Sequence, residues 1–263
     1  MADLLSKDAP RAEIQRAAHE IRMKLNPHPS GQLDANVPVH EGHRKTGLQH
    51  TYPETVLIFP RQGQTCHTYC TYCFRWPQFV GESDLPIATE DVAATSAYLR
   101  AHPEVTSALI TGGDPLVMST QVLRRYMEPL LEIDTVRSIR IGTKSLAFWP
   151  YRFTTDRDAD DLLRLFEQVV ASGRHLALMA HFTPPQELRP PVVRAAMRRV
   201  RDMVPYYQFV ERDTGPQGFF GVPLARGSQI SRDACVHVAG KHEVVGLAGA
   251  LRCVRGPPVA PHH

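Results

Sequence analysis

The sequence predicts an α/β fold in which repeated strand–helix units form a parallel sheet. Along the middle of the chain, short apolar or β-branched runs alternate with amphipathic stretches, which is the order typical of βα units. The 263 residues, of which 43% are hydrophobic, are enough for one large core or two small ones. We therefore expect a globular protein built around a parallel sheet or barrel.

Residues 1–50 lead into this fold. A helix is expected at about 10–25, where the chain is charged and amphipathic. The segment that follows is rich in Pro, Gly and His and has no hydrophobic periodicity, which predicts loops. We assign 1–50 to a helix and loop-rich N-terminal lead-in.

Residues 51–212 contain the strand–helix units. Strands are expected at the short β-branched or apolar runs 55–59, 106–110, 137–141, 175–181 and 205–210. Helices are expected at the amphipathic stretches between them, at 90–101, 120–131, 158–171 and 192–202. The last segment, 213–263, is rich in turn-forming residues and has a Pro-rich end. We expect this C-terminal tail to be irregular, with truncation of the fold as one explanation.

Charge and hydropathy exclude several classes of partner. The 30 basic and 27 acidic residues give a net charge of +3, which is too balanced to indicate a nucleic-acid-binding or anionic-membrane-binding surface. No run approaches 18 uninterrupted apolar residues, and the N-terminus lacks the apolar segment of a signal peptide. We therefore expect a cytoplasmic protein that binds neither nucleic acid nor membrane.

Three of the five cysteines, Cys66, Cys70 and Cys73, lie within eight residues directly after the first predicted strand. In βα folds the active site lies at the C-terminal ends of the strands, so this loop is well placed for chemistry. Three thiolates can bind three irons of a cubane cluster and leave the fourth iron open to a non-protein ligand. The alternative is a zinc loop completed by a distant histidine.

The spacing C-x3-C-x2-C, with Tyr72 before the third cysteine, resembles the signature of radical S-adenosylmethionine (radical SAM) enzymes. The segments CHTYCTYCFRW, ALITGGDPL, RIGTKS and HFTPPQEL resemble the lysine 2,3-aminomutase family, and the resemblance covers about residues 25–225. It implies a partial, open βα barrel of the radical SAM type, with a [4Fe-4S] cluster on the three cysteines. It also implies S-adenosylmethionine near Tyr72, an external one-electron donor and a 5'-deoxyadenosyl radical.

The resemblance places further cofactor contacts at the ends of the next two strands. Gly112 and Gly113 would let the backbone approach a ligand closely, and Asp114 or a carbonyl would hold the methionine ammonium. Thr143 and Ser145 can form hydrogen bonds to ribose or carboxylate oxygens. The alternative for the Gly-Gly-Asp-Pro segment is an ordinary strand–helix turn capped by aspartate.

Two residues are candidates for a catalytic role. His181 ends an apolar run and matches the histidine that family members place beside S-adenosylmethionine; the alternative is a core histidine. Arg75 matches an arginine that holds a carboxylate in the aminomutases, whereas the alternative is a solvated arginine or a structural ion pair. Lys144 could pair with an anion or be a solvated lysine at a strand end.

The sequence departs from the family in two ways. It lacks the glycine-rich segment with the lysine that binds pyridoxal phosphate: Lys241 is the only lysine in the C-terminal third, and Thr55 stands where aminomutases commonly carry an arginine. Use of pyridoxal phosphate is therefore open, and we expect weak binding or none. Five predicted strands instead of six imply a barrel that is one βα unit short, unless the tail supplies a substitute.

The leading hypothesis is a radical SAM isomerase that begins with hydrogen abstraction and moves an amino group from carbon 2 to carbon 3. Its substrate would be a small amino acid or a lysyl group of a protein. The second hypothesis is a truncated, non-catalytic relative that keeps the cluster or the fold as an interaction module. A homo-oligomer is compatible with either hypothesis.

Overall fold

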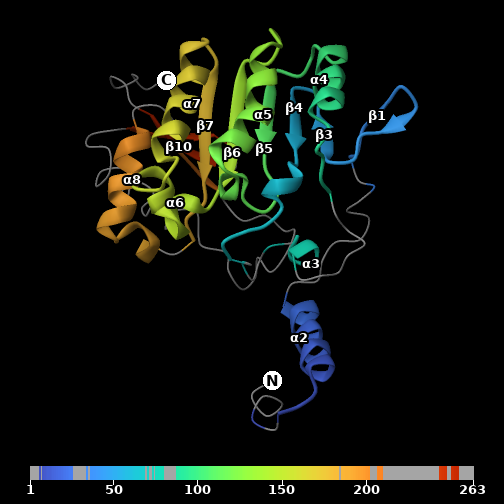
Figure 1. The fold of residues 1–263 in the computed structure, drawn as a ribbon, viewed down its shortest axis with the longest axis vertical. Coiled ribbons are helices and arrows are strands. Elements are labelled where there is room, and N and C mark those ends of the chain that lie inside the picture. The colour runs from blue at the N-terminus through green and yellow to red at the C-terminus, as the bar shows by residue number, and fades with distance from the viewer. Residues whose placement is uncertain are drawn as a thin grey trace, which may run out of the picture.

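The main body of the protein is a mixed eight-stranded sheet with helices packed on it (Figure 1). The computed structural model describes residues 6, 8–25, 34, 36–68, 70, 73, 75–79, 87–183, 185–201, 206–209, 243–247 and 250–254. Among these residues, no helix is long and apolar enough to cross a membrane.

The sheet has eight strands in the order β3-β4-β5-β6-β7-β8-β10-β9. Their bounds are β3 (Leu48–Tyr52), β4 (Thr55–Ile58), β5 (Ser107–Ile110), β6 (Ser138–Thr143), β7 (His175–Ala180), β8 (Tyr206–Phe209), β9 (Glu243–Leu247) and β10 (Ala250–Val254). The five strands from β4 to β8 are parallel, and β3, β10 and β9 are antiparallel to their neighbours. The predicted α/β fold with a five-stranded parallel sheet is therefore confirmed.

Apart from the N-terminal α2, the helices come after parallel strands along the chain. Their bounds are α2 (Arg11–Leu25), α3 (Trp76–Phe79), α4 (Val92–Ala101), α5 (Thr120–Leu131), α6 (Ser145–Phe148), α7 (Ala159–Ala171) and α8 (Pro191–Arg201). Capping explains where two of them begin, because Asp91 accepts a hydrogen bond from Ala94 N and Ser119 accepts one from Val122 N. The helices α4, α5 and α7 lie on one face of the sheet (Figure 1).

The core lies between these helices and the sheet. In β4, β5 and β6 every second residue is buried, as expected for strands with one face against helices. Val56, Ile110 and Ile141 belong to the same buried cluster as Leu123 and Phe166 of the helices. This packing fixes the register of the strands, so that β4, β5 and β6 end at a common edge.

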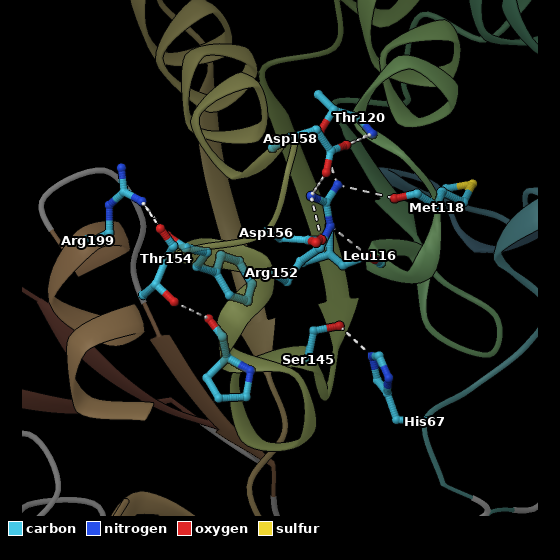
Figure 2. Close-up of polar contacts among 12 residues, drawn as sticks. His67, Leu116, Met118, Thr120, Ser145, Arg152, Thr154, Asp156, Asp158 and Arg199 are labelled. Carbon is cyan, nitrogen blue, oxygen red and sulfur yellow. Dashed lines mark hydrogen bonds and ion pairs between the residues drawn. The ribbon is translucent and has the colours of Figure 1, made fainter. Parts of the chain in front are cut away.

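Arg152 holds the segments beyond this edge together. Its side chain is fully buried, and its guanidinium donates hydrogen bonds to the carbonyls of Leu116 and Met118 and to Asp158 (Figure 2). The first two residues follow β5, whereas Arg152 follows β6. The buried charge is paired with Asp158, as it must be at low dielectric, and the hydrogen bonds to Leu116 and Met118 connect two consecutive strand–helix segments.

Two strands, β9 and β10, lie within the C-terminal tail that was expected to be irregular, and the rest of this tail lies outside the described residues. β10 pairs with β8 and covers backbone groups that would otherwise form an open edge. The signal was present in the sequence: two runs with strand-forming residues, 243–247 and 250–254, are separated by two residues, as in a hairpin.

The lead-in also contains strands that were not expected. A two-stranded sheet forms from β1 (Val39–His40) and β2 (His43–Arg44), and β3 pairs with β4. Within the described part of the chain, β3 and β9 are the two ends of the large sheet, and no pairing between them closes it. The position beside β8, where a sixth parallel strand would pair, is occupied by β10.

Candidate functional site

Asp114 connects the ends of β5 and β6. Its side chain is fully buried, and its carboxylate accepts hydrogen bonds from Thr143 Oγ1 at 2.8 and 3.0 Å, from Lys144 N at 2.7 Å and from Leu116 N at 3.0 Å. These hydrogen bonds fit the alternative considered for the Gly-Gly-Asp-Pro segment, an ordinary strand–helix turn capped by aspartate. The predicted contact of this carboxylate with the methionine ammonium of S-adenosylmethionine therefore stays a prediction.

Gly112 and Gly113 let the segment before the cysteines lie against the end of β5. A Cβ atom on Gly113 would lie 2.0 Å from the carbonyl oxygen of Thr65, and one on Gly112 would lie 2.2 Å from Nε2 of Gln64. In addition, Asp114 N donates a hydrogen bond to Thr65 O at 2.7 Å. The two glycines are therefore needed because Gln64 and Thr65, the residues immediately before Cys66, approach them closely.

The three cysteines are free thiols on one loop. Burial, with a smaller contribution from the charge of Cys70, raises the pKa of the Cys66 thiol and raises that of Cys73 to about 11. The thiols are therefore near enough to interact, and a bound metal would relieve the repulsion between their thiolates. This donor set fits an iron–sulfur cluster. Among the described residues, however, no three His, Cys, Asp or Glu side chains already surround a possible metal position, so cluster binding stays a prediction.

Arg75 lies beside the cysteine loop as a buried cation. Its side chain is 7% exposed, and its guanidinium carbon lies 4.0 Å from the centre of the Phe59 ring. Burial lowers the pKa of Arg75 to about 10, and Cys73 opposes this shift. The part of the chain that the structure describes contains no ion pair between Arg75 and an acidic residue. The structural ion pair considered from the sequence is therefore not found among these residues.

Lys144 lies at the end of β6 and forms a buried ion pair that the sequence did not reveal. Its ammonium donates hydrogen bonds to both carboxylate oxygens of Glu187, at 3.0 and 3.1 Å, and to Thr183 Oγ1 at 3.0 Å. The two charged side chains are 5% and 15% exposed. Lys144 is thus not a solvated lysine, and the anion that it binds is the carboxylate of Glu187.

His181 lies next to this ion pair, at the end of β7. Its backbone N–H donates to the carbonyl of Thr143 at 2.8 Å, which holds it beside the end of β6. Burial, with a contribution from the charge of Lys144, lowers the pKa of His181 to about 4. The imidazole is therefore neutral at physiological pH.

His67 is a residue of the site that the sequence analysis did not single out. It follows Cys66 directly, and its Nε2 lies 2.7 Å from Ser145 Oγ (Figure 2). Ser145 was expected to contact the cofactor, as was Thr143, and both hydroxyls form hydrogen bonds within the protein. Only the position of His67 within the cysteine loop could have indicated it.

The structure thus brings most of the predicted residues to one edge of the sheet. Hydrogen bonds join Asp114, Thr143 and Ser145 to one another or to the cysteine loop. Tyr72 lies outside the described residues. The roles of all these residues in binding a cofactor stay predictions.

Comparison with known proteins identifies relatives that are named 2,3-aminomutases. The chain is 40% identical to a protein of Aquifex aeolicus named "Putative L-lysine 2,3-aminomutase", over 60% of this chain and 40% of the relative. It is 31% identical to the L-lysine 2,3-aminomutase of Bacillus subtilis, over 58% of this chain and 32% of the relative. With the L-lysine 2,3-aminomutase of Clostridium subterminale, it shares 28% identity over 89% of this chain and 50% of the relative.

The similarity covers most of this chain but at most half of these relatives. The matched regions correspond to between 32% and 50% of the relatives' lengths. No protein-family model matches the chain.

Proposed function

We propose that the chain, whose relatives indicate a lysine 2,3-aminomutase-like family, is a radical SAM isomerase that moves an amino group between neighbouring carbons. The observation that carries the proposal is the position of Cys66, Cys70 and Cys73: the segment before them contacts Gly113 and Asp114, at the C-terminal edge of the parallel sheet. We propose the partial, open barrel of the radical SAM type as the fold that surrounds this edge.

Each part of the edge has a role in the proposal. The three thiolates would hold a [4Fe-4S] cluster. When it is bound and reduced by an external donor, such a cluster with S-adenosylmethionine supplies a radical that abstracts hydrogen from a substrate. Asp114 and Thr143 keep the strand ends together beneath the loop.

Arg75 would bind the carboxylate of the substrate. It keeps its positive charge at neutral pH because its pKa is about 10, and its planar group is stacked on Phe59. A buried guanidinium attracts a carboxylate more strongly than an exposed one does, because less water screens the two charges. The planar guanidinium can make a two-bond contact with a carboxylate.

His181 would contact S-adenosylmethionine as a neutral group. The sulfonium of this cofactor is a cation, and an imidazole whose pKa is about 4 does not repel it at pH 7. A neutral imidazole carries one hydrogen-bond donor and one acceptor. Lys144 would not bind the cofactor directly, because Glu187 and Thr183 occupy its ammonium.

We propose a free amino acid or a lysyl group of a protein as the substrate, and leave the use of pyridoxal phosphate open. Lys241 lies outside the described residues, and the ammonium of Lys144 is engaged by Glu187. The non-catalytic interaction module is the weaker hypothesis, because the names of the relatives indicate aminomutases and because a buried cation lies next to the cysteine loop.

The proposal is tested by loading the protein with iron and sulfide without oxygen and adding dithionite and S-adenosylmethionine. We expect 5'-deoxyadenosine, formed faster when a substrate such as lysine, glutamate or a lysyl peptide is present. The triple variant Cys66→Ala, Cys70→Ala, Cys73→Ala is the matched control and should form none. Protein that carries a cluster but forms no 5'-deoxyadenosine with any substrate would contradict the proposal.

A further inference from the structure

We propose that His67 is a positioning residue that acts through Cys66: its imidazole anchors the cysteine loop to the end of β6 and fixes the backbone of the first thiol ligand. The inference rests on the proposed function in one respect, namely that Cys66 binds the cluster. The anchor itself is a property of the metal-free protein.

The contact between His67 and Ser145 has the geometry of a short, partly buried hydrogen bond. Nε2 lies 2.7 Å from Oγ, across 78 residues of sequence, and 3.6 Å from Oδ2 of Asp114. The imidazole is 14% exposed and Ser145 is fully buried. Trp149 packs against the imidazole edge to face, with ring centres 5.7 Å apart. The ring is thus held by an apolar contact and by a polar one, the hydrogen bond to Ser145 that Figure 2 shows.

The partner of His67 is itself fixed. Ser145 N donates to Thr143 Oγ1 at 3.0 Å, and Ser145 O accepts from Trp149 N at 2.8 Å. Thr143 is in turn bound to Asp114. An anchor is useful only if it does not move, and these bonds connect Ser145 to the strand ends rather than to a free loop.

Cys66 lies between two anchors. On its N-terminal side, Thr65 O accepts a hydrogen bond from Asp114 N. On its C-terminal side, the His67 side chain binds Ser145. The first anchor leads to the end of β5 and the second to the end of β6, so the backbone of Cys66 is held at both neighbours. The second and third cysteines are joined by a backbone hydrogen bond within the loop, which Cys73 N donates to Cys70 O.

The test is the alkylation rate of each cysteine in metal-free protein, at one pH and under brief exposure to iodoacetamide, mapped by mass spectrometry. In His67→Ala we expect Cys66 to react about fivefold faster than in the wild type, the effect of losing one hydrogen bond. The rates of Cys70 and Cys73 should change less. Ser145→Ala removes the same bond from the other side and should give the same pattern.

Two further variants separate anchoring from a general loss of structure. His67→Gln places an amide near the position of Nε2 and should restore slow alkylation of Cys66. His175→Ala is the matched control, because His175 also contacts a serine, Ser138, across β6 and β7, but at the opposite ends of these strands. It should leave all three rates unchanged. Circular dichroism monitors the folding of each variant.

The proposal is overturned if Cys66 reacts at the wild-type rate in His67→Ala, or if all three cysteines accelerate equally. If the variants fold and load with iron, the reduction potential of the cluster should also shift in His67→Ala and return in His67→Gln. A wild-type protein that binds no iron would contradict the proposed function but not the anchor, because alkylation is measured without metal.

Discussion

Thr143 and Asp114 are joined by a buried hydrogen bond that connects two neighbouring parallel strands at their C-terminal ends. The hydroxyl donates to the carboxylate, with oxygen–oxygen distances of 2.8 and 3.0 Å, and the two residues are 4% and 0% exposed. The same carboxylate accepts from the backbone of Lys144, and the backbone of Asp114 donates to Thr65, one residue before the first cysteine. The pair therefore supports the place where the cysteine loop meets the sheet.

Asp114→Ala should destabilise the protein by about 2–4 kcal/mol, because it leaves buried donors of Leu116, Thr143 and Lys144 without an acceptor. The free energy of unfolding in urea measures this. The exposed Asp134 provides the control: Asp134→Ala should change the unfolding free energy by at most about 0.5 kcal/mol. Equal stability of the two variants would show that the network around Asp114 is unimportant.

Gly113→Ala should reduce the iron content of protein loaded with iron and sulfide. The added Cβ would lie 2.0 Å from a backbone atom of Thr65, which must move and take Cys66 with it. Gly173→Ala is a suitable control. It is strained by its positive φ but meets no atom within 4 Å, so it should lower stability and leave iron binding intact. Normal iron content in Gly113→Ala would contradict this explanation of the glycine.

The pH dependence of stability should carry a contribution from His181. Its pKa is about 4 in the folded protein, below the ordinary 6.5, so the unfolded chain binds a proton between these values and the folded protein does not. Stability attributed to His181 is therefore present above pH 6.5 and is lost as the pH falls toward 4, by up to about 3 kcal/mol.

The measurement is the difference between the unfolding free energies of the wild type and His181→Asn as a function of pH. Carboxylates contribute similarly to both curves, so the difference isolates the imidazole. Parallel curves between pH 4 and 6.5 would mean that the imidazole is protonated in the folded protein.

Arg75→Lys should lower kcat/KM for an amino-acid substrate by about 100-fold, because an ammonium cannot make the planar two-bond contact with a carboxylate or stack on Phe59 in the same way. Formation of 5'-deoxyadenosine without substrate should stay near the wild-type level. Arg198→Lys, at an exposed position on α8, is the control and should leave both rates unchanged. An unchanged kcat/KM in Arg75→Lys would remove Arg75 from the substrate site.

The elements were predictable where local patterns decide the structure. The expected helix 120–131 is observed with the same bounds, because Ser119 caps it and its apolar residues follow one face. The strand expected at 106–110 could be predicted from its short apolar run, and the structure buries every second residue of the observed strand. In the tail, β9 and β10 were missed because their runs are short and surrounded by turn-forming residues.

The partners within the site were less predictable than its residues. The order of motifs brought Asp114, Thr143 and Ser145 to one edge, since parallel strands end together. Nothing local indicates that Asp114 accepts a bond from Thr143, or that Glu187 binds Lys144, 43 residues away. Such contacts depend on how loops of different lengths fold over the edge, which periodicity does not describe.

The most direct test of the account is electron paramagnetic resonance of the reduced protein, loaded anaerobically, before and after addition of S-adenosylmethionine. With an open iron on Cys66, Cys70 and Cys73, we expect about four irons per chain and a cluster signal that changes when S-adenosylmethionine binds. The variants Cys235→Ala and Cys253→Ala should behave like the wild type. A chain that binds zinc instead of iron, or a cluster signal that does not respond to S-adenosylmethionine, would contradict the account.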